Sequence, residues 1–292
     1  MAERICVRDD PLLGVLVIVL AVLGGFAIWA GLFWQGAAVP LAEVASVRGE
    51  AVALDGRGAY RFNPVFQAAT YRAQDMVMAA ALLLALWAAL AMRGGQALAL
   101  LLAALGYAVY GHASVALSAA LDWLFAAHVV LFALAWLALW RAGLSAVAAF
   151  DRPGLPRRGL AAFLLVAGVG TVAVWAPPLL SDLAAGQAPP RLGTQTTEVT
   201  HALDLAVIVP LCLVAAWLVW RGRALGHVLA LPLIGCLLLL LPTIALATVL
   251  QMRAGIELDL PEWLGPVGAF AVLGVVAAVF LRAYLRALRP LA

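Results

Sequence analysis

The chain has 292 residues, of which 66% are hydrophobic and only 11% are charged. A soluble domain usually carries about 25% charged residues, so a soluble core could not hide this much apolar surface, and lipid must surround much of the chain. All 18 basic residues are arginine, which excludes a Schiff-base lysine enzyme and a P-loop ATPase, because both require a lysine. The net charge of +3 requires no nucleic-acid partner, because cytoplasmic loops of membrane proteins are themselves basic.

Eight apolar segments follow one another along the chain, and each approaches the roughly 20 apolar residues that a membrane-spanning helix needs. They predict an all-α, polytopic membrane helix bundle that forms one membrane domain over residues 1–292. The predicted spans cover residues 11–34, 75–92, 96–117, 122–140, 159–176, 201–220, 224–249 and 264–285. The lipid bilayer is therefore the predicted main partner of the chain.

The arginines predict the orientation of these spans, because loops on the cytoplasmic side are enriched in basic residues. With the N-terminus inside, twelve arginines lie in inner segments and six in outer segments. Tryptophans mark both membrane boundaries, as amphipathic rings do at headgroup depth; the outer ones are Trp34, Trp123, Trp175 and Trp263, and the inner ones are Trp140 and Trp220. We therefore predict a multi-pass protein of a bacterial inner (plasma) membrane with both termini in the cytoplasm.

Two predicted outer loops are long and cover residues 35–74 and 177–200. In the first, Asp55-Gly56 lies between short alternating runs, which is typical of a small β-hairpin. The segment after Pro64 is expected to form a helix on the membrane surface. Long loops on a compact body often carry function, although mere spacers between spans are equally common.

The two halves of the chain, residues 1–150 and 151–292, show a similar order of features. Asp75 precedes an apolar span that ends at Arg93, and Asp204 precedes an apolar span of nearly the same length that ends at Arg221. Two repeated four-helix units of the same orientation would be related by an axis along the membrane normal, with a site near their interface. The alternative is that topology alone places acids at the outer ends of these helices and arginines at the inner ends.

Ionisable groups inside a membrane are costly and are therefore functional candidates. His201 and Asp204 are three residues apart near the start of the sixth span, so they lie on one helix face. An imidazole beside a carboxylate can bind a cation or metal ion, or relay a proton. The alternative is helix-end chemistry, because a carboxylate in the first turn interacts favourably with the helix dipole.

A second set of ionisable residues lies near the outer ends of the third and fourth spans. His112 is near the end of the third span, and His128 is about two turns into the fourth, with Asp122 before it. Two histidines on neighbouring helices can ligate a metal ion or a haem, which are the two candidate cofactors. The alternative is a histidine hydrogen-bonded to a neighbouring helix, and Tyr107 and Tyr110 are candidate partners for such a network or for a ligand.

The first function that these residues allow is a transporter or channel for a small solute or ion. Its candidate binding residues are Asp75, Asp204, His201, Tyr107 and Tyr110. Prolines that interrupt the sixth and seventh spans favour this function, because broken membrane helices often line a binding site. In this interpretation the protein is not an enzyme.

Two alternatives belong to other classes of protein. One is a membrane-embedded metal- or haem-dependent enzyme with a site on the outer side, whose candidate ligands are His112, His128, His201, Asp122 and Asp204. The other is a non-catalytic subunit that assembles with or anchors other membrane subunits, with the outer hairpin as a docking element. The sequence favours the transporter, because broken helices and equivalent acids occur together.

Overall fold

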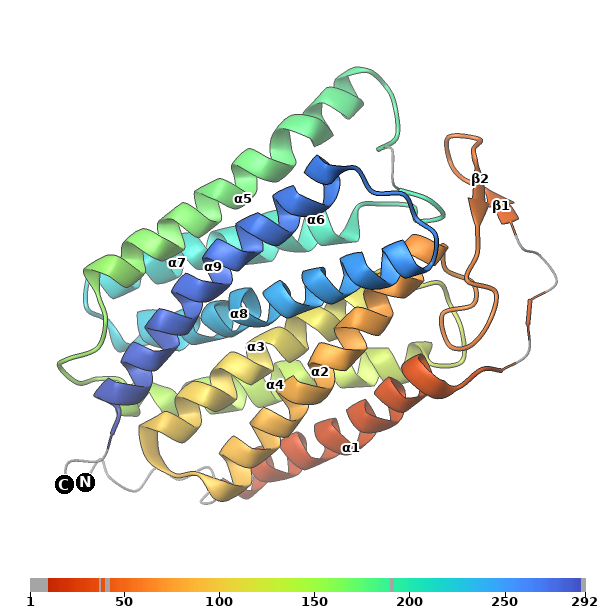
Figure 1. The fold of residues 1–292 in the computed structure, drawn as a ribbon. Helices are drawn as coiled ribbons and strands as arrows, with labels where there is room; N and C mark the ends of the chain where they lie inside the picture. Colours follow the sequence, from red (N-terminus) through yellow and green to blue (C-terminus); the bar gives the residue numbers. More distant parts are fainter. Residues whose placement is uncertain (1–9, 37, 40–42, 190–191, 290–292) are drawn as a thin grey trace.

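A computed structural model of the protein describes residues 10–36, 38–39, 43–189 and 192–289. Within them are eight helical spans that are long and apolar enough to cross a membrane. Seven spans are single helices: α1 (Pro11–Phe33), α2 (Val65–Ala91), α3 (Gly94–Ser118), α4 (Phe125–Ala149), α5 (Arg158–Ala184), α8 (Ala224–Arg253) and α9 (Leu260–Ala287). The sixth span consists of α6 (Val199–Leu203), the π-helical turn η2 (Asp204–Ile208) and α7 (Val209–Trp220). The predicted all-α, multi-pass membrane bundle is confirmed (Figure 1).

The ends of several helices differ from the predicted spans. Helix α2 begins well before its predicted span, because the helix expected after Pro64 is continuous with it. Its first turns contain Gln67 and Gln74, which are buried against protein and lower the local hydropathy from which spans are recognised. Helix α5 continues through Pro177 and Pro178. Arg4, Arg8 and Arg191, which contributed to the predicted orientation, lie outside the described residues, and the orientation stays a prediction.

The order of helix contacts is similar in the two halves of the bundle. In the first half, α1 packs on α2 and α4, and α3 packs on the same two helices. In the second half, α7 packs on α5 and α8, and α9 packs on α8. The halves meet mainly where α8 lies against α2 and α3 (Figure 1). This order agrees with a duplicated four-helix unit, which stays a prediction because alternating topology by itself favours contacts between consecutive helices.

Helices α3 and α8 approach each other closely at two glycines. A methyl group on Gly106 would collide with the backbone of Pro232, and a methyl group on Gly235 would collide with the backbone of Ala103. The two contacts are reciprocal, because each helix presents a glycine to the backbone of the other. Gly106 and Gly235 are separated along the chain by as many residues as Ala103 and Pro232. Small residues allow such close backbone approach in membranes, where helix association depends on packing rather than on the exclusion of water.

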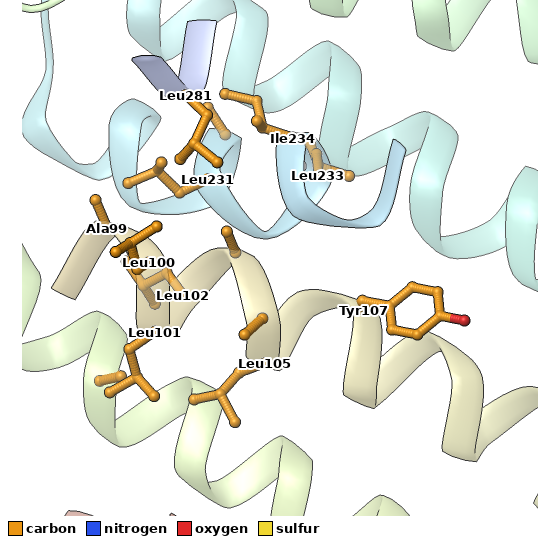
Figure 2. Close-up of a cluster of buried hydrophobic side chains, with 14 of the residues drawn as sticks. Ala99, Leu100, Leu101, Leu102, Leu105, Tyr107, Leu231, Leu233, Ile234 and Leu281 are labelled. Carbon is orange, nitrogen blue, oxygen red and sulfur yellow. The ribbon is translucent and has the colours of Figure 1, made fainter. Parts of the chain in front are cut away.

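Leucines surround this contact and form the largest hydrophobic core of the protein. Figure 2 shows large apolar side chains of α3 on one side, with those of α8 and α9 on the other. The labelled members are Ala99, Leu100, Leu101, Leu102, Leu105 and Tyr107 of α3, Leu231, Leu233 and Ile234 of α8, and Leu281 of α9. Helix α3 is therefore an internal helix, whereas most other spans expose one face to lipid.

The first long loop, which is predicted to lie on the outer side and is here called the outer loop, holds a small antiparallel hairpin, as expected, but its turn lies before the predicted one. Strand β1 (Glu43–Ala45) pairs with β2 (Ala51–Ala53) through a turn at residues 46–50. Gly49 in that turn adopts a positive φ, which glycine tolerates without steric cost. The chain reverses direction a second time after the hairpin. The predicted turn residue Asp55 lies at the start of this second reversal, where its backbone N–H donates to the carbonyl of Asn63.

Residues 59–64 of the same loop close one end of the first four helices. Tyr60 and Asn63 are each 2% exposed. The side-chain oxygen of Asn63 accepts a hydrogen bond from the backbone N–H of Ala120 at 2.7 Å, and its amide donates to the carbonyl of Tyr60 at 3.2 Å. The loop is thus part of the folded body, and it carries Tyr60 into the bundle.

Replacing Arg72 with glutamine is expected to loosen this loop from the bundle. Arg72 of α2 donates to both carboxylate oxygens of Asp55, each at 2.6 Å, and paired donors of this kind are stronger than single ones. Trypsin cleavage after the exposed Arg57 should therefore rise several-fold. The control Glu50→Gln removes only an exposed pair with Arg48 and should leave the cleavage rate unchanged; equal rates in the two variants would contradict the prediction.

Candidate functional site

The structure places all the predicted site residues except Tyr107 in or beside three groups, all in the half of the bundle that carries the two long loops. The Asp75 group consists of Asp75 and its partner Tyr60. The Asp204 group consists of Asp204, Tyr110, Trp175 and His201. The histidine pair consists of His112 and His128.

Asp75 is buried between the outer loop and helices α1 and α2, and it is 5% exposed. The hydroxyl of Tyr60 donates to its carboxylate at 2.8 Å. Gly31 of α1 makes room for that carboxylate, because a methyl group on Gly31 would collide with it. Burial, reinforced by the neighbouring carboxylate, raises the pKa of Tyr60 well above its ordinary value, so this hydroxyl keeps its proton and acts as the donor.

Asp204 connects three helical spans through its two carboxylate oxygens. Tyr110 of α3 donates to Oδ1 at 3.0 Å, and the indole N–H of Trp175 on α5 donates to Oδ2 at 2.8 Å. Unlike Asp75, Asp204 is only partly buried. A carboxylate in this position joins α3 and α5 to the sixth span, and its charge state decides how strongly they are joined.

The sixth span departs from α-helical geometry at Asp204. The backbone N–H of Val209 donates to the carbonyl of Asp204, five residues earlier. Pro210 follows directly; it has no N–H to donate and would clash with the carbonyl four residues before it. The chain relieves that conflict by widening the turn, and such π-helical turns occur frequently at functional sites.

His201 and Asp204 share Trp175 rather than bonding to each other. The ring centroids of His201 and Trp175 are 4.2 Å apart, in an edge-to-face arrangement, while Asp204 accepts a hydrogen bond from the indole N–H. The Nδ1 atom of His201 lies 3.0 Å from a carboxylate oxygen of Glu198. The predicted pairing of His201 with Asp204 is therefore indirect, with the tryptophan between them.

The histidine pair lies between α3 and α4, with ring centroids 6.5 Å apart. His112 and His128 are 4% and 5% exposed. Asp122 lies at the mouth of this region, where its Oδ1 accepts the backbone N–H of Leu124 at 2.8 Å, and burial raises the pKa of its carboxyl. A cavity of about 10 Å³, with space for one water-sized molecule, is bordered by both Asp122 and His128.

The two candidate tyrosines of α3 have different partners. Tyr107 bonds to the hydroxyl of Thr243 on α8 at 2.7 Å, and Tyr110 bonds to Asp204. Tyr107 thus joins the two halves at the α3–α8 contact, close to Gly106. Only Tyr110 belongs to a group with an acid.

The five predicted metal ligands lie on different sides of α3. Tyr110, which contacts Asp204, and His112 are two residues apart, which corresponds to about 200° around a helix. Asp204 and His201 therefore lie on one side of α3, and the histidine pair on the other. Among the described residues, no group of three or more His, Cys, Asp and Glu side chains could hold a metal ion. A metal or haem cofactor stays a prediction, and it cannot rest on all five residues together.

Sequence reasoning did not identify three residues that bond to the predicted site residues. Tyr60 lies in a loop without periodicity, Trp175 was assigned only to the membrane boundary, and Thr243 carries no charge. A signal existed for Trp175, because an indole N–H near headgroup depth still needs an acceptor. No local signal marks Tyr60, because its partner lies on a different element.

The groups rest on this chain's own geometry alone: no protein-family model, no curated protein and no solved structure matches it.

Proposed function

We propose that the protein transports a small solute or ion across the membrane and that Asp204 binds the transported or coupled cation or proton. The observation that carries this proposal is a single one: a partly buried carboxylate begins the π-helical turn of a membrane span and is hydrogen-bonded by two other helices. Ionisable groups inside membranes mark ion pathways and proton relays by default. Interrupted helices supply the irregular backbone that lines such sites.

The geometry supports a direct link between the charge of Asp204 and helix packing. When the carboxylate is ionised, the hydroxyl of Tyr110 and the indole of Trp175 each donate a charge-assisted hydrogen bond. Protonation, or a bound cation, removes much of that attraction. Helices α3 and α5 are then held less tightly to the π-helical turn, and the sixth span can move. Binding and movement are coupled through one side chain.

Asp75 is a structural counterpart rather than a second transport site. The separation along the chain from Asp75 to Asp204 equals that from Gly106 to Gly235, the two glycines of the α3–α8 contact. A duplicated unit would give this common separation and would allow the two halves to rock about that contact. Asp75, however, is locked under the outer loop by Tyr60, whereas Asp204 is partly exposed and receives its donors from two other spans.

Replacing Asp204 with asparagine is expected to abolish transport without unfolding the protein. Cells that express the chain would be incubated with a mixture of small solutes, and accumulation or loss of each solute would be measured by mass spectrometry. A solute identified in this way is then tested in proteoliposomes that contain a pH-sensitive dye, so that proton movement is read at the same time. The asparagine keeps the size of the side chain and loses its charge.

The matched control is Asp182→Asn, which removes a carboxylate from the same end of α5 outside all three groups. This variant should transport like the original chain. Unchanged transport in Asp204→Asn, at equal protein levels and equal thermal stability, would overturn the assignment of Asp204. Absence of any solute moved by the original chain would count against transport itself.

A second candidate function is a subunit of a membrane complex, and one observation favours it. Helix α9 exposes a stripe of large apolar side chains, with Val272, Val275 and Val279 each at least 61% exposed. Lipid covers such a stripe in a monomer, and another membrane subunit covers it in a complex. Native mass spectrometry of protein taken from its own membrane distinguishes the two, because a subunit would carry a second polypeptide.

A further inference from the structure

The histidine pair has features that the transport proposal does not use. His112 and His128 come from adjacent helices, and both side chains are at least nine-tenths buried. Among the described residues, Nε2 of His112 and both ring nitrogens of His128 have no hydrogen-bond partner. Oδ2 of Asp122, at the mouth of the same region, is likewise buried without a partner in this part of the chain. Four polar atoms of three side chains therefore lie in one region without bonds.

Such a cluster is energetically unfavourable unless something binds to it. Each buried polar atom without a partner costs about 1–3 kcal/mol, and a bound ion or water is the usual explanation for such groups in a native protein. The buried histidine His227 behaves differently, because its Nδ1 bonds to the hydroxyl of Tyr284 at 2.6 Å. A histidine can thus be buried in this bundle together with a protein partner, whereas three of the four ring nitrogens of the histidine pair have none among the described residues.

We propose that His112 and His128 bind one Cu(I) ion between their rings. A neutral imidazole offers one nitrogen lone pair, and imidazole is a good ligand for copper. Zinc requires about four ligands, and no cluster of three or more candidate ligands exists among the described residues. Monovalent copper can be held by two nitrogens in a nearly linear arrangement, so a pair of histidines in apolar surroundings suits it.

The separation of the rings agrees with one ion between them. Two metal–imidazole bonds of about 2.0–2.1 Å each, end to end, span about 4.1 Å between nitrogens. The ring centroids must be farther apart than the nitrogens, because each nitrogen lies at the edge of its ring. The centroids of His112 and His128 are 6.5 Å apart, and the ring planes are tilted by 42°. A zinc site with tetrahedral angles would need the rings to be closer than they are.

Asp122 and the small cavity provide the route by which a cation reaches the pair. The cavity of about 10 Å³ is bordered by Asp122, Tyr60 and His128, and it lies at the end of α3 and α4 next to the outer loop. The Oδ2 atom of Asp122 accepts no hydrogen bond from the described residues, although the charge of Arg61 acts on the same carboxyl group. A carboxylate at the mouth attracts a cation from water, and the imidazoles behind it offer the softer ligands.

Copper titration of the purified chain tests this proposal. The protein is titrated with Cu(I) under reducing conditions against a chromophoric Cu(I) chelator, and the bound metal is then examined by X-ray absorption. Because thiolates also bind Cu(I), the titration uses a chain in which Cys6, Cys212 and Cys236 are replaced by serine. We expect one Cu(I) per chain, with an absorption edge typical of two nitrogen ligands.

Matched variants locate the ion. His112→Gln and His128→Gln should each abolish binding of Cu(I), and of Ag(I) as a redox-inert probe, whereas His227→Gln should not. Asp122→Asn should slow uptake of the metal more than it lowers the final amount bound. Retention of copper in the His112→Gln/His128→Gln double variant, or no copper bound by the cysteine-free chain, overturns the proposal. The transport proposal is unaffected by either result, because Asp204 lies on the other side of α3.

Discussion

A valine at Gly235 is expected to destabilise the membrane body strongly. Even the first carbon of that side chain would collide with the backbone of Ala103 on α3, and a backbone cannot rotate away as a side chain can. Helices α3 and α8 must therefore separate, and the Leu231 and Ile234 side chains around the contact lose their packing. Overpacking of this kind costs about 1–3 kcal/mol or more. The measurement is the thermal unfolding midpoint of the purified protein in detergent.

Gly25→Val is the matched control for this experiment. Gly25 lies in the interior of helix α1, and nothing lies within 4 Å of a carbon added there. The control carries the same change in helix propensity but faces lipid, so its unfolding midpoint should stay close to that of the original chain. Equal loss in both variants would show that valine acts through helix propensity and not through the α3–α8 contact.

The second large effect is expected at Asp75. Asp75→Ala leaves the buried hydroxyl of Tyr60 without its acceptor, and Tyr60→Phe leaves the carboxylate without its donor. Each single variant should lose about 1–3 kcal/mol of stability, because the remaining polar partner stays buried without its hydrogen bond. The double variant should lose much less than the sum, since it leaves no unpaired partner.

The control cycle combines Asp75→Ala with Tyr284→Phe. Tyr284 bonds to His227 between α8 and α9, far along the bundle from the outer loop. These two changes should be additive, because they share no partner. Additive losses in the Asp75–Tyr60 cycle as well would mean that the hydrogen bond does not hold the loop to the bundle. The readout for both cycles is the free energy of unfolding in a denaturing detergent series.

The hydrogen bond between Tyr60 and Asp75 also bears on the proposal that the protein is a transporter. Asp75 is sealed by Tyr60 of the loop, so of these two acids it is Asp204 whose donors come from separate spans. The two acids occupy equivalent places in the order of the helices but differ in what holds them. The enclosed Asp75 supports the packing of its half of the bundle. In the proposed transport function, the partly exposed Asp204 changes its charge when it binds or releases a cation or proton. This difference is the reason to test Asp204 first.

The sequence by itself determined the number and order of the spans. Insertion into lipid depends on the length and hydropathy of a local segment, and both can be counted along the chain. The same local contrast identified Asp75, Asp204, His112 and His128, because an ionisable side chain is conspicuous inside an apolar run. The hairpin in the first loop was also recognisable, although its turn was not located correctly.

Only the tertiary structure decided which of these residues act together. Asp75 pairs with a loop residue 15 positions away, and Asp204 pairs with Tyr110, 94 positions away. Hydropathy does not specify which helix faces meet, because lipid and leucine are equally apolar and packing alone selects the contacts. Two glycines on α3 and α8 set a close contact between the halves. The positions of Tyr110 and His112 on opposite sides of α3 separate Asp204 from the histidine pair. Which side of a helix faces which neighbour is decided by the packing of the whole bundle, and no local segment of the sequence specifies it.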